Sequence, residues 1–274
     1  MVEKIFRFLS AGWQSFLSIL KILLYSKWKT GLPRVFTNQD ELVILANGPS
    51  LNKTITESAD FLKGKTLLAV NFLKPEVYLI ADPLFWIVPE KRISLFETLA
   101  NKTTWDVSFF IPYRAFKNKD WQPFLSNHPH IRVYAYNTTP VEGYQCFCNR
   151  VYASGLGVPR PHNVLIPSIV MALNLSFQKV YLAGADHSWL TEISVTDENE
   201  VLVHQKHFYD RKTSKAEVVL KENLESASLY TILHHMSVAF KSYFTIKAYA
   251  NSLKKEVINI TPESFIDAFK RLKL

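Results

Sequence analysis

The chain has 274 residues, of which 48% are hydrophobic and 14% aromatic, and its 32 basic and 24 acidic residues give a formal charge of +8. This is enough apolar material for one large α/β domain or two small ones, and it excludes large-scale disorder. The positive charge predicts an anionic partner. Because the chain has neither an aromatic-basic RNA-binding signature nor a zinc-finger spacing, no nucleic acid is expected.

The first predicted element is an amphipathic helix over residues 4–28. Arg7 and Lys21 interrupt the roughly 20 apolar residues that a membrane span requires, and no signal-peptide cleavage site follows. We therefore expect residues 1–30 to attach a cytoplasmic protein to the inner face of the plasma membrane. The alternative is packing on the protein's own core or on a second subunit of a homo-oligomer. Two residue sets define the helix, an apolar one at helical spacing (Ile5, Leu9, Trp13, Leu17, Leu20, Leu24) and a narrow polar stripe opposite (Lys4, Arg7, Ser10, Gln14, Ser18, Lys21).

Strands and helices then alternate over residues 31–274, which predicts an α/β fold with a doubly wound, mostly parallel sheet. Residues 187–215 lose this periodicity and predict an irregular lid. The strands are expected from Leu42 and over 65–70, 76–81, 107–111, 131–136, 179–183 and 245–250. The helices are expected from Thr54 to about Leu62, over 93–100, 164–175 and 216–243, and after Pro262.

The two cysteines, Cys146 and Cys148, are one residue apart. This spacing makes a poor disulfide and supplies at most half of a metal site. Both are therefore predicted to be reduced thiols, as in a cytosolic protein.

Polar residues follow several predicted strands. The first strand breaks into the turn formed by Asn47, Gly48, Pro49 and Ser50, and other strands end at Asn71, Asp82, Asp186 and Asn251. The carboxyl ends of parallel strands share one edge of a sheet, where α/β proteins bind ligands. We therefore expect a site there for a nucleotide or sugar. Each residue taken singly is also an ordinary turn former.

Four segments together resemble a known group of enzymes. They are VILANGPSL at 43–51, Asn71, the ADP at 81–83, and SIVMALNLSFQKVYLAGAD at 168–186. The combination resembles the bacterial CMP-sialic acid sialyltransferases of lipooligosaccharide synthesis. The wider group around them includes flagellin-modifying glycosyltransferases and archaeal hydroxymethylpterin diphosphokinases. The resemblance covers roughly residues 40 to 255.

This resemblance implies a Rossmann-like domain with a lid over a CMP-sugar, metal-free inverting transfer, and no bound cofactor. It places Asn47, Gly48 and Ser50 against the nucleotide and Asn71 at the phosphate and sugar, and it matches the turn from Gly184 to Asp186 to the cytidine pocket. Three departures stand out. Asp82 replaces a family Asn, Arg160 and Asn163 are only nearby candidates for a missing Arg-x-Thr-Ser-Gly motif, and Ser188 replaces a tyrosine.

The resemblance also implies a histidine on the lid as general base, and His207 is our candidate, with His204 as the alternative. A histidine can accept the proton of an attacking hydroxyl because its pKa lies near neutrality. Tyr209 and Arg211 could stabilise the leaving phosphate. A metal site built from His187, His204, His207 and Asp186 has no supporting short-range spacing, so no metal is expected.

The expected function is therefore transfer of a group from a CMP-activated donor to a hydroxyl of a cell-surface glycan or its lipid-linked precursor. The first alternative is a hydroxymethylpterin diphosphokinase-like enzyme that uses ATP. The second is a non-catalytic, membrane-associated nucleotide-binding protein.

Overall fold

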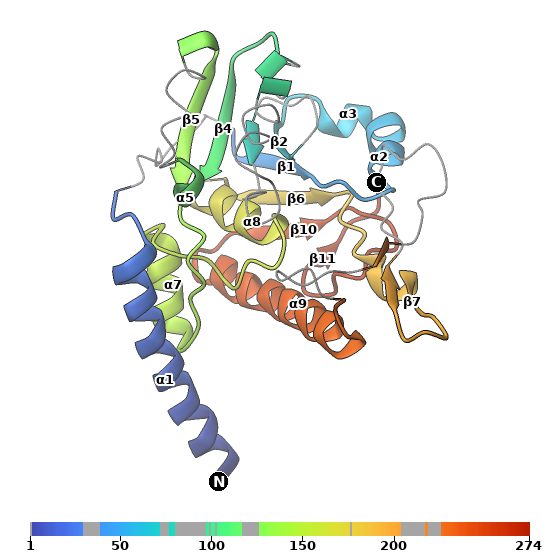
Figure 1. Ribbon diagram of the computed structural model, residues 1–274. Helices are drawn as coiled ribbons and strands as arrows, with labels where there is room; N and C mark the ends of the chain where they lie inside the picture. The colour runs from blue at the N-terminus through green and yellow to red at the C-terminus, as the bar shows by residue number, and fades with distance from the viewer. Residues whose placement is uncertain are drawn as a thin grey trace.

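The computed structural model describes residues 2–29, 39–71, 77–79, 97–98, 100–101, 103–116, 126–175, 177–203, 217–218 and 226–274. Within these ranges the chain folds as an α/β protein whose helices cover both faces of a parallel sheet (Figure 1). This confirms the predicted fold class. The helical elements are α1 (Val2–Tyr25), α2 (Leu51–Glu57), α3 (Ala59–Leu62), α5 (Tyr113–Phe116), α7 (Gln145–Ala153), α8 (Leu165–Asn174), the 3-10 helix η2 (Ser188–Glu192) and α9 (Leu229–Ser252).

The main sheet has the strand order β11-β10-β6-β1-β2-β3-β4-β5 among the described residues, and each of these neighbouring pairs is parallel. Its strands are β1 (Glu41–Leu45), β2 (Thr66–Val70), β3 (Val77–Leu79), β4 (Val107–Pro112), β5 (Ile131–Tyr136), β6 (Lys179–Ala183), β10 (Glu256–Asn259) and β11 (Lys270–Arg271). The chain runs outward from β1 to β5, then returns to the other side of β1 to form β6. The boundary between β1 and β6 is therefore a topological switch point, where ligands of open α/β sheets bind.

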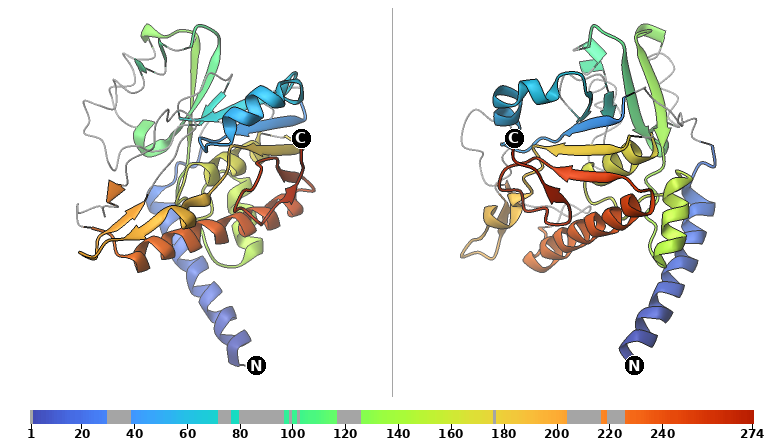
Figure 2. Two further views of the ribbon diagram at one scale, coloured as in Figure 1. Left: turned by 90° about the vertical axis from the view of Figure 1, so that its right-hand side faces the viewer. Right: turned by 180° about the vertical axis from the view of Figure 1, so that it is seen from behind.

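Strand β1 lies at the centre of the core, and its side chains alternate between the two faces of the sheet. Leu42 and Ile44 pack in the larger apolar cluster, which includes side chains of α8 and α9. Val43 and Leu45 pack in a second cluster, with Phe61 of α3 on the opposite face. Figure 2 shows the helices on both sides of the sheet. The unbroken apolar run of β1 thus follows from burial on both faces.

Helix α1 docks on the rest of the molecule through small and polar side chains. Ser18 Oγ donates to the carbonyl of Glu142 over 2.8 Å and accepts the Glu142 amide over 2.9 Å. The amide of Tyr144 donates to Ser15 Oγ over 3.0 Å. Gly143 lies against Ser15, where an added Cβ would stand only 2.1 Å from its Oγ. Of the predicted polar stripe, Ser18 is therefore buried against the protein, whereas Lys4 and Arg7 are exposed. The N-terminal half of α1 projects beyond the body (Figure 1).

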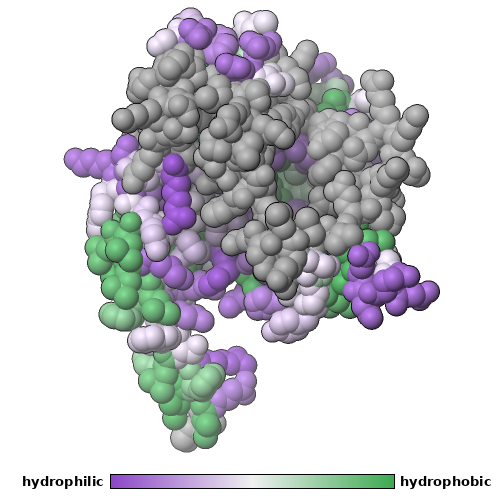
Figure 3. All heavy atoms as spheres, in the orientation of Figure 1, coloured by the Kyte–Doolittle hydropathy of each residue, from purple (hydrophilic) through white to green (hydrophobic). Residues whose placement is uncertain are grey.

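Much of the remaining surface of α1 is apolar and exposed. Leu9 and Trp13 are 64% and 61% exposed, and apolar side chains cover much of the projecting part of α1 in Figure 3. By length and composition α1 could also cross a membrane, although signal sequences meet the same criteria.

The C-terminal region corrects three predictions. Residues 245–250 form the last part of α9, not a strand, so Asn251 is helical and does not end a strand. The strand in this region is β10, which follows α9. A helix was expected after Pro262, but residues 262–274 contain strand β11 instead. The long helix was expected from residue 216 but begins at Leu229. Residues 217–218 of the expected helix belong to strand β9 (Glu217–Val218).

The described part of the predicted lid is more ordered than expected. Residues 188–192 form η2, and β7 (Ile193–Val195) pairs antiparallel with β8 (Val201–Val203). Strand β8 also pairs with β9 in a small second sheet. Residues 204–215 lie outside the described residues, as do residues 30–38, between α1 and β1, and most of the predicted helix 93–100.

Candidate functional site

The turn after β1 lies directly against the turn after β6. The amide of Gly48 donates to the carbonyl of Gly184 over 2.9 Å. A Cβ added to Gly48 would stand 1.9 Å from Asp186 Oδ2 and 2.5 Å from the Gly184 carbonyl oxygen. Position 48 is therefore glycine because two strand ends approach closely, and its amide serves this contact rather than a ligand.

Asp186 holds the β1 turn in place. Its carboxylate accepts the Ser50 hydroxyl over 2.9 Å and the Ser50 amide over 3.3 Å. Burial raises the pKa of Asp186 above its ordinary value, and the hydrogen bonds from Ser50 partly oppose this shift. Because its hydroxyl is directed to Asp186, Ser50 makes no side-chain cap for α2. The helix expected from Thr54 begins at Leu51 instead, so Thr54 lies inside α2.

A cavity of about 190 Å³ opens at this switch point between β1 and β6, and we call it the switch-point crevice. Most predicted binding residues of the strand ends line it. The predicted members are Asn47, Gly48, Pro49, Asn71, Asn163, Gly184, Asp186 and Ser188, and the others described are Ala46, Val70, Val164, Leu165, His187, Trp189 and Glu192.

One polar atom of the crevice has no hydrogen-bond partner. The side-chain oxygen of Asn47 is the only buried side-chain polar atom in the described part of the chain that lacks one. An unsatisfied buried acceptor costs about 1–3 kcal/mol. A ligand that brings a hydroxyl or amino donor to Asn47 would remove this cost.

His187 is the described histidine of the crevice. It follows Asp186 with φ +53°, a left-handed conformation that is uncommon for a non-glycine residue. Its Nε2 lies 2.5 Å from the hydroxyl of Tyr243, which also lies 3.0 Å from Asn163 Nδ2. Burial lowers the pKa of His187 to about 3, so the ring is neutral at pH 7. If the Tyr243 hydroxyl donates to Nε2, Nδ1 carries the ring proton and is a hydrogen-bond donor.

The other predicted site residues fall in two groups. Arg160 does not line the crevice, because its guanidinium forms an ion pair with Glu142. The second group lies outside the described residues. It consists of the binding residue Asp82 and the candidate catalytic residues His204, His207, Tyr209 and Arg211.

Two of the residues that sequence reasoning missed, His187 and Tyr243, contact each other. His187 was weighed only as a metal ligand, although its position directly after the Gly184–Asp186 turn could have identified it. Tyr243 gave no signal, because it lies 56 residues from His187 and only the packing of α9 against the sheet brings them together.

A larger cavity, of about 550 Å³, lies between α1 and the carboxyl end of β5. We place the nucleotide in the smaller crevice, because the crevice lies at the switch point and contains the unpaired Asn47 acceptor. The two cavities share Asn163 and Val164 in their walls.

No protein-family model matches this chain, and no curated protein is significantly similar to it. The resemblance to sialyltransferases therefore stays a prediction.

Proposed function

We propose that this protein is a transferase that moves a group from a CMP-activated donor to a hydroxyl of a cell-surface glycan or its lipid-linked precursor, without a metal. The observation that carries the proposal is the switch-point crevice, where predicted nucleotide-binding residues from three strand ends meet. Open α/β sheets bind nucleotides at this position.

In this proposal the nucleoside part of the donor lies at the turn from Asn47 to Ser50. The buried Asn47 oxygen accepts a hydrogen bond from a ribose hydroxyl or from the cytosine amino group. Asp186 orders this turn through Ser50, so it shapes the pocket besides lining it.

Departure of CMP requires stabilisation of a phosphate. The neutral His187 ring, held by Tyr243, offers its Nδ1–H as a donor toward that charge. His207 remains the proposed general base, with His204 as the alternative, and Tyr209 and Arg211 are proposed to assist at the phosphate. The acceptor hydroxyl gives its proton to the base as its oxygen attacks the donor, and CMP leaves with the electrons of the broken bond.

Nucleotide selectivity is the first test. A thermal-shift comparison of CMP, UDP, GDP and ATP, each with and without magnesium, should give preferential stabilisation by CMP that needs no metal. Asn47→Ala should lose that shift, and Asn251→Ala, at an exposed position on α9, should keep it. A response to ATP with magnesium alone would favour the diphosphokinase alternative and overturn the proposal.

Turnover is the second test. His207→Ala should abolish transfer and leave the CMP shift nearly intact, while unchanged turnover would move the base to His204 or elsewhere. If CMP binds but no transfer is found with any glycan or lipid-linked acceptor, the non-catalytic alternative is favoured.

We also propose that α1 holds the protein at the inner face of the plasma membrane. Exposed apolar side chains with basic residues among them suit a bilayer surface. Replacing Leu9 and Trp13 by Asp leaves the buried Ser15 and Ser18 contacts in place and should reduce partition onto anionic vesicles. Unchanged partition would contradict the assignment.

A further inference from the structure

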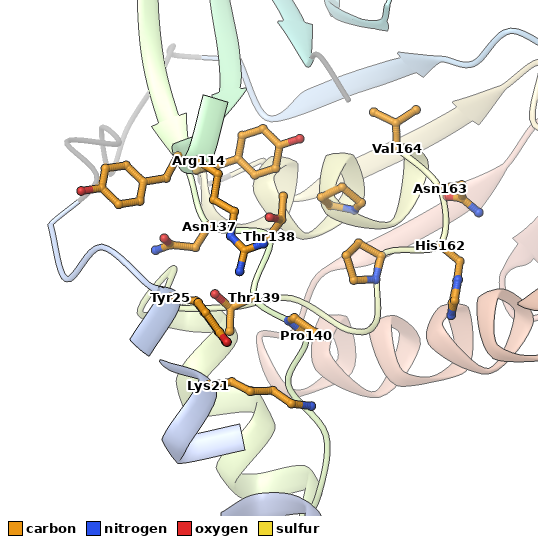
Figure 4. A pocket seen from close by; sticks show the side chains of 14 residues that line it. Lys21, Tyr25, Arg114, Asn137, Thr138, Thr139, Pro140, His162, Asn163 and Val164 are labelled. Carbon is orange, nitrogen blue, oxygen red and sulfur yellow. The ribbon is translucent and has the colours of Figure 1, made fainter. Parts of the chain in front are cut away.

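The larger cavity is built where α1 meets the domain. Lys21 and Tyr25 of α1 form one side, and Arg114 of α5 and Thr138, just after β5, form the other (Figure 4). Its volume of about 550 Å³ is within the range of small-molecule sites, 300 to 1,000 Å³. We call this cavity the helix-side pocket.

The charges of the helix-side pocket have one sign. Lys21 and Arg114 line it, and its described lining contains no Asp or Glu. No ion pair joins Lys21 or Arg114 to another described residue. The Arg114 guanidinium instead lies over the ring of Tyr25, 4.7 Å from its centroid. Two cations with no carboxylate partner among the described residues favour an anionic ligand, and a guanidinium and an ammonium both suit phosphate.

The walls of the pocket are fixed by hydrogen bonds around the end of α1. The side chain of Asn137 accepts the Lys27 amide over 2.9 Å and donates to the Lys27 carbonyl over 2.9 Å. Ser26 Oγ donates to the Leu156 carbonyl and lies 2.8 Å from Thr139 Oγ1. The pocket is therefore preformed, which lowers the cost of ordering it around a ligand.

The position of the pocket indicates an amphiphilic ligand. The helix that supplies Lys21 and Tyr25 exposes apolar side chains, among them Leu20 and Leu24, which are 41% and 73% exposed. A free phosphate compound would use the cations alone. A lipid would use the cations for its head group and the apolar surface of α1 for its chain.

We propose that the helix-side pocket binds the phosphate-bearing head group of a membrane lipid whose hydrocarbon chain lies along α1. This inference rests on the proposed function in one respect, because it makes the pocket the acceptor subsite for a lipid-linked acceptor. Asn163 and Val164 line both cavities, so an acceptor held here lies next to the donor crevice.

The test measures partition of the full-length chain onto neutral vesicles that contain either a polyprenyl phosphate or an equal charge of phosphatidylglycerol. The wild type should prefer the polyprenyl phosphate. Lys21→Ala and Arg114→Ala should each weaken that binding roughly fivefold, as expected for one basic residue at a phosphate-bearing surface. The matched controls are Lys241→Ala and Arg132→Ala, which remove the same charge at exposed positions outside the pocket.

Equal binding to both vesicle types, unaltered in the double variant Lys21→Ala/Arg114→Ala, would overturn the proposal. Stabilisation by soluble inorganic pyrophosphate without any preference for the lipid would overturn the lipid assignment. The CMP-induced thermal shift separates this test from the proposed function. The double variant should keep the CMP-induced shift. If the wild type binds the lipid but not CMP, the lipid site stands, but its role as an acceptor subsite is overturned.

Discussion

The hydroxyl of Ser50 donates a hydrogen bond to the carboxylate of Asp186 over 2.9 Å, and these residues are 136 positions apart in the sequence. The bond joins the turn after β1 to the turn after β6. Strands β1 and β6 are thereby fixed to each other at the edge where the switch-point crevice opens.

Gly48→Ala should damage the crevice. An added Cβ has no room beside Asp186 and Gly184, and overpacking of this kind costs about 1–3 kcal/mol. We expect a lower free energy of unfolding in urea and loss of the CMP-induced thermal shift. Gly64→Ala is the control, because position 64 has φ +74° but open space around it. It should lose stability and keep the shift; a normal shift in Gly48→Ala would contradict this account.

The free energy of unfolding should fall as the pH drops below about 6.5. Burial lowers the pKa of His187 to about 3 and that of His162 to about 4. Between these values and 6.5 the unfolded chain binds protons that the folded chain does not, so acid favours unfolding. Asp186 acts in the opposite direction, because its pKa is raised in the folded state.

Comparison of variants isolates the histidine contribution to this pH dependence. Urea unfolding between about pH 7 and pH 5 should show a smaller loss of stability in His162→Gln than in the wild type. His128→Gln is the control, because His128 is not among the groups that shift the pKa of His162. If the free energy of unfolding changes equally with pH in His162→Gln and in the wild type, His162 has the same pKa in the folded and unfolded chains, which would contradict the prediction.

Gly143→Ala should weaken the packing of α1 against residues 142–144. Position 143 has φ +132°, and the added methyl group would stand 2.1 Å from Ser15 Oγ and 2.7 Å from its amide nitrogen. Hydrogen exchange of residues 11–25 should become faster. Gly155→Ala provides a control with a similar backbone requirement, φ +67°, and open space around it. Equal protection of α1 in both variants would contradict the role of Gly143.

Thiol titration should distinguish the two cysteines. Cys146 is exposed, whereas Cys148 is buried and burial raises the pKa of its thiol. Because the thiolate is the reactive form, Cys146 should react quickly with a disulfide reagent in the folded protein and Cys148 only on unfolding. Cys146→Ser should remove the fast phase, and a second fast thiol would contradict the burial of Cys148.

The central strands could be predicted from the sequence because burial on both faces gives them continuous apolar runs. Residues 179–183 were predicted as a strand and form β6. Residues 245–250 misled the prediction, since they are rich in residues that favour strands. In the structure Ile246, Tyr249 and Ala250 are buried at helical spacing, so packing of α9 on the sheet decides their conformation.

The candidate site could be predicted where it consists of strand ends, because a parallel sheet brings those ends to one edge. Asn47, Asn71 and Asp186 follow this rule and line the crevice. The contact of His187 with Tyr243 could not be predicted in this way, because it depends on how the long helix α9 packs on the rest of the domain. The burial of Ser15 and Ser18 on α1 was also unpredictable, because their partners are residues 142–144.

The distance in sequence between Ser18 and Glu142, 124 residues, sets an order of events during synthesis. At roughly 5–20 residues per second, α1 leaves the ribosome on the order of 10 s before the segment on which it docks. Throughout that interval its apolar surface has no partner in the nascent chain beyond its nearest neighbours. A bilayer or a chaperone can therefore contact α1 before residues 142–144 are available to pack against it.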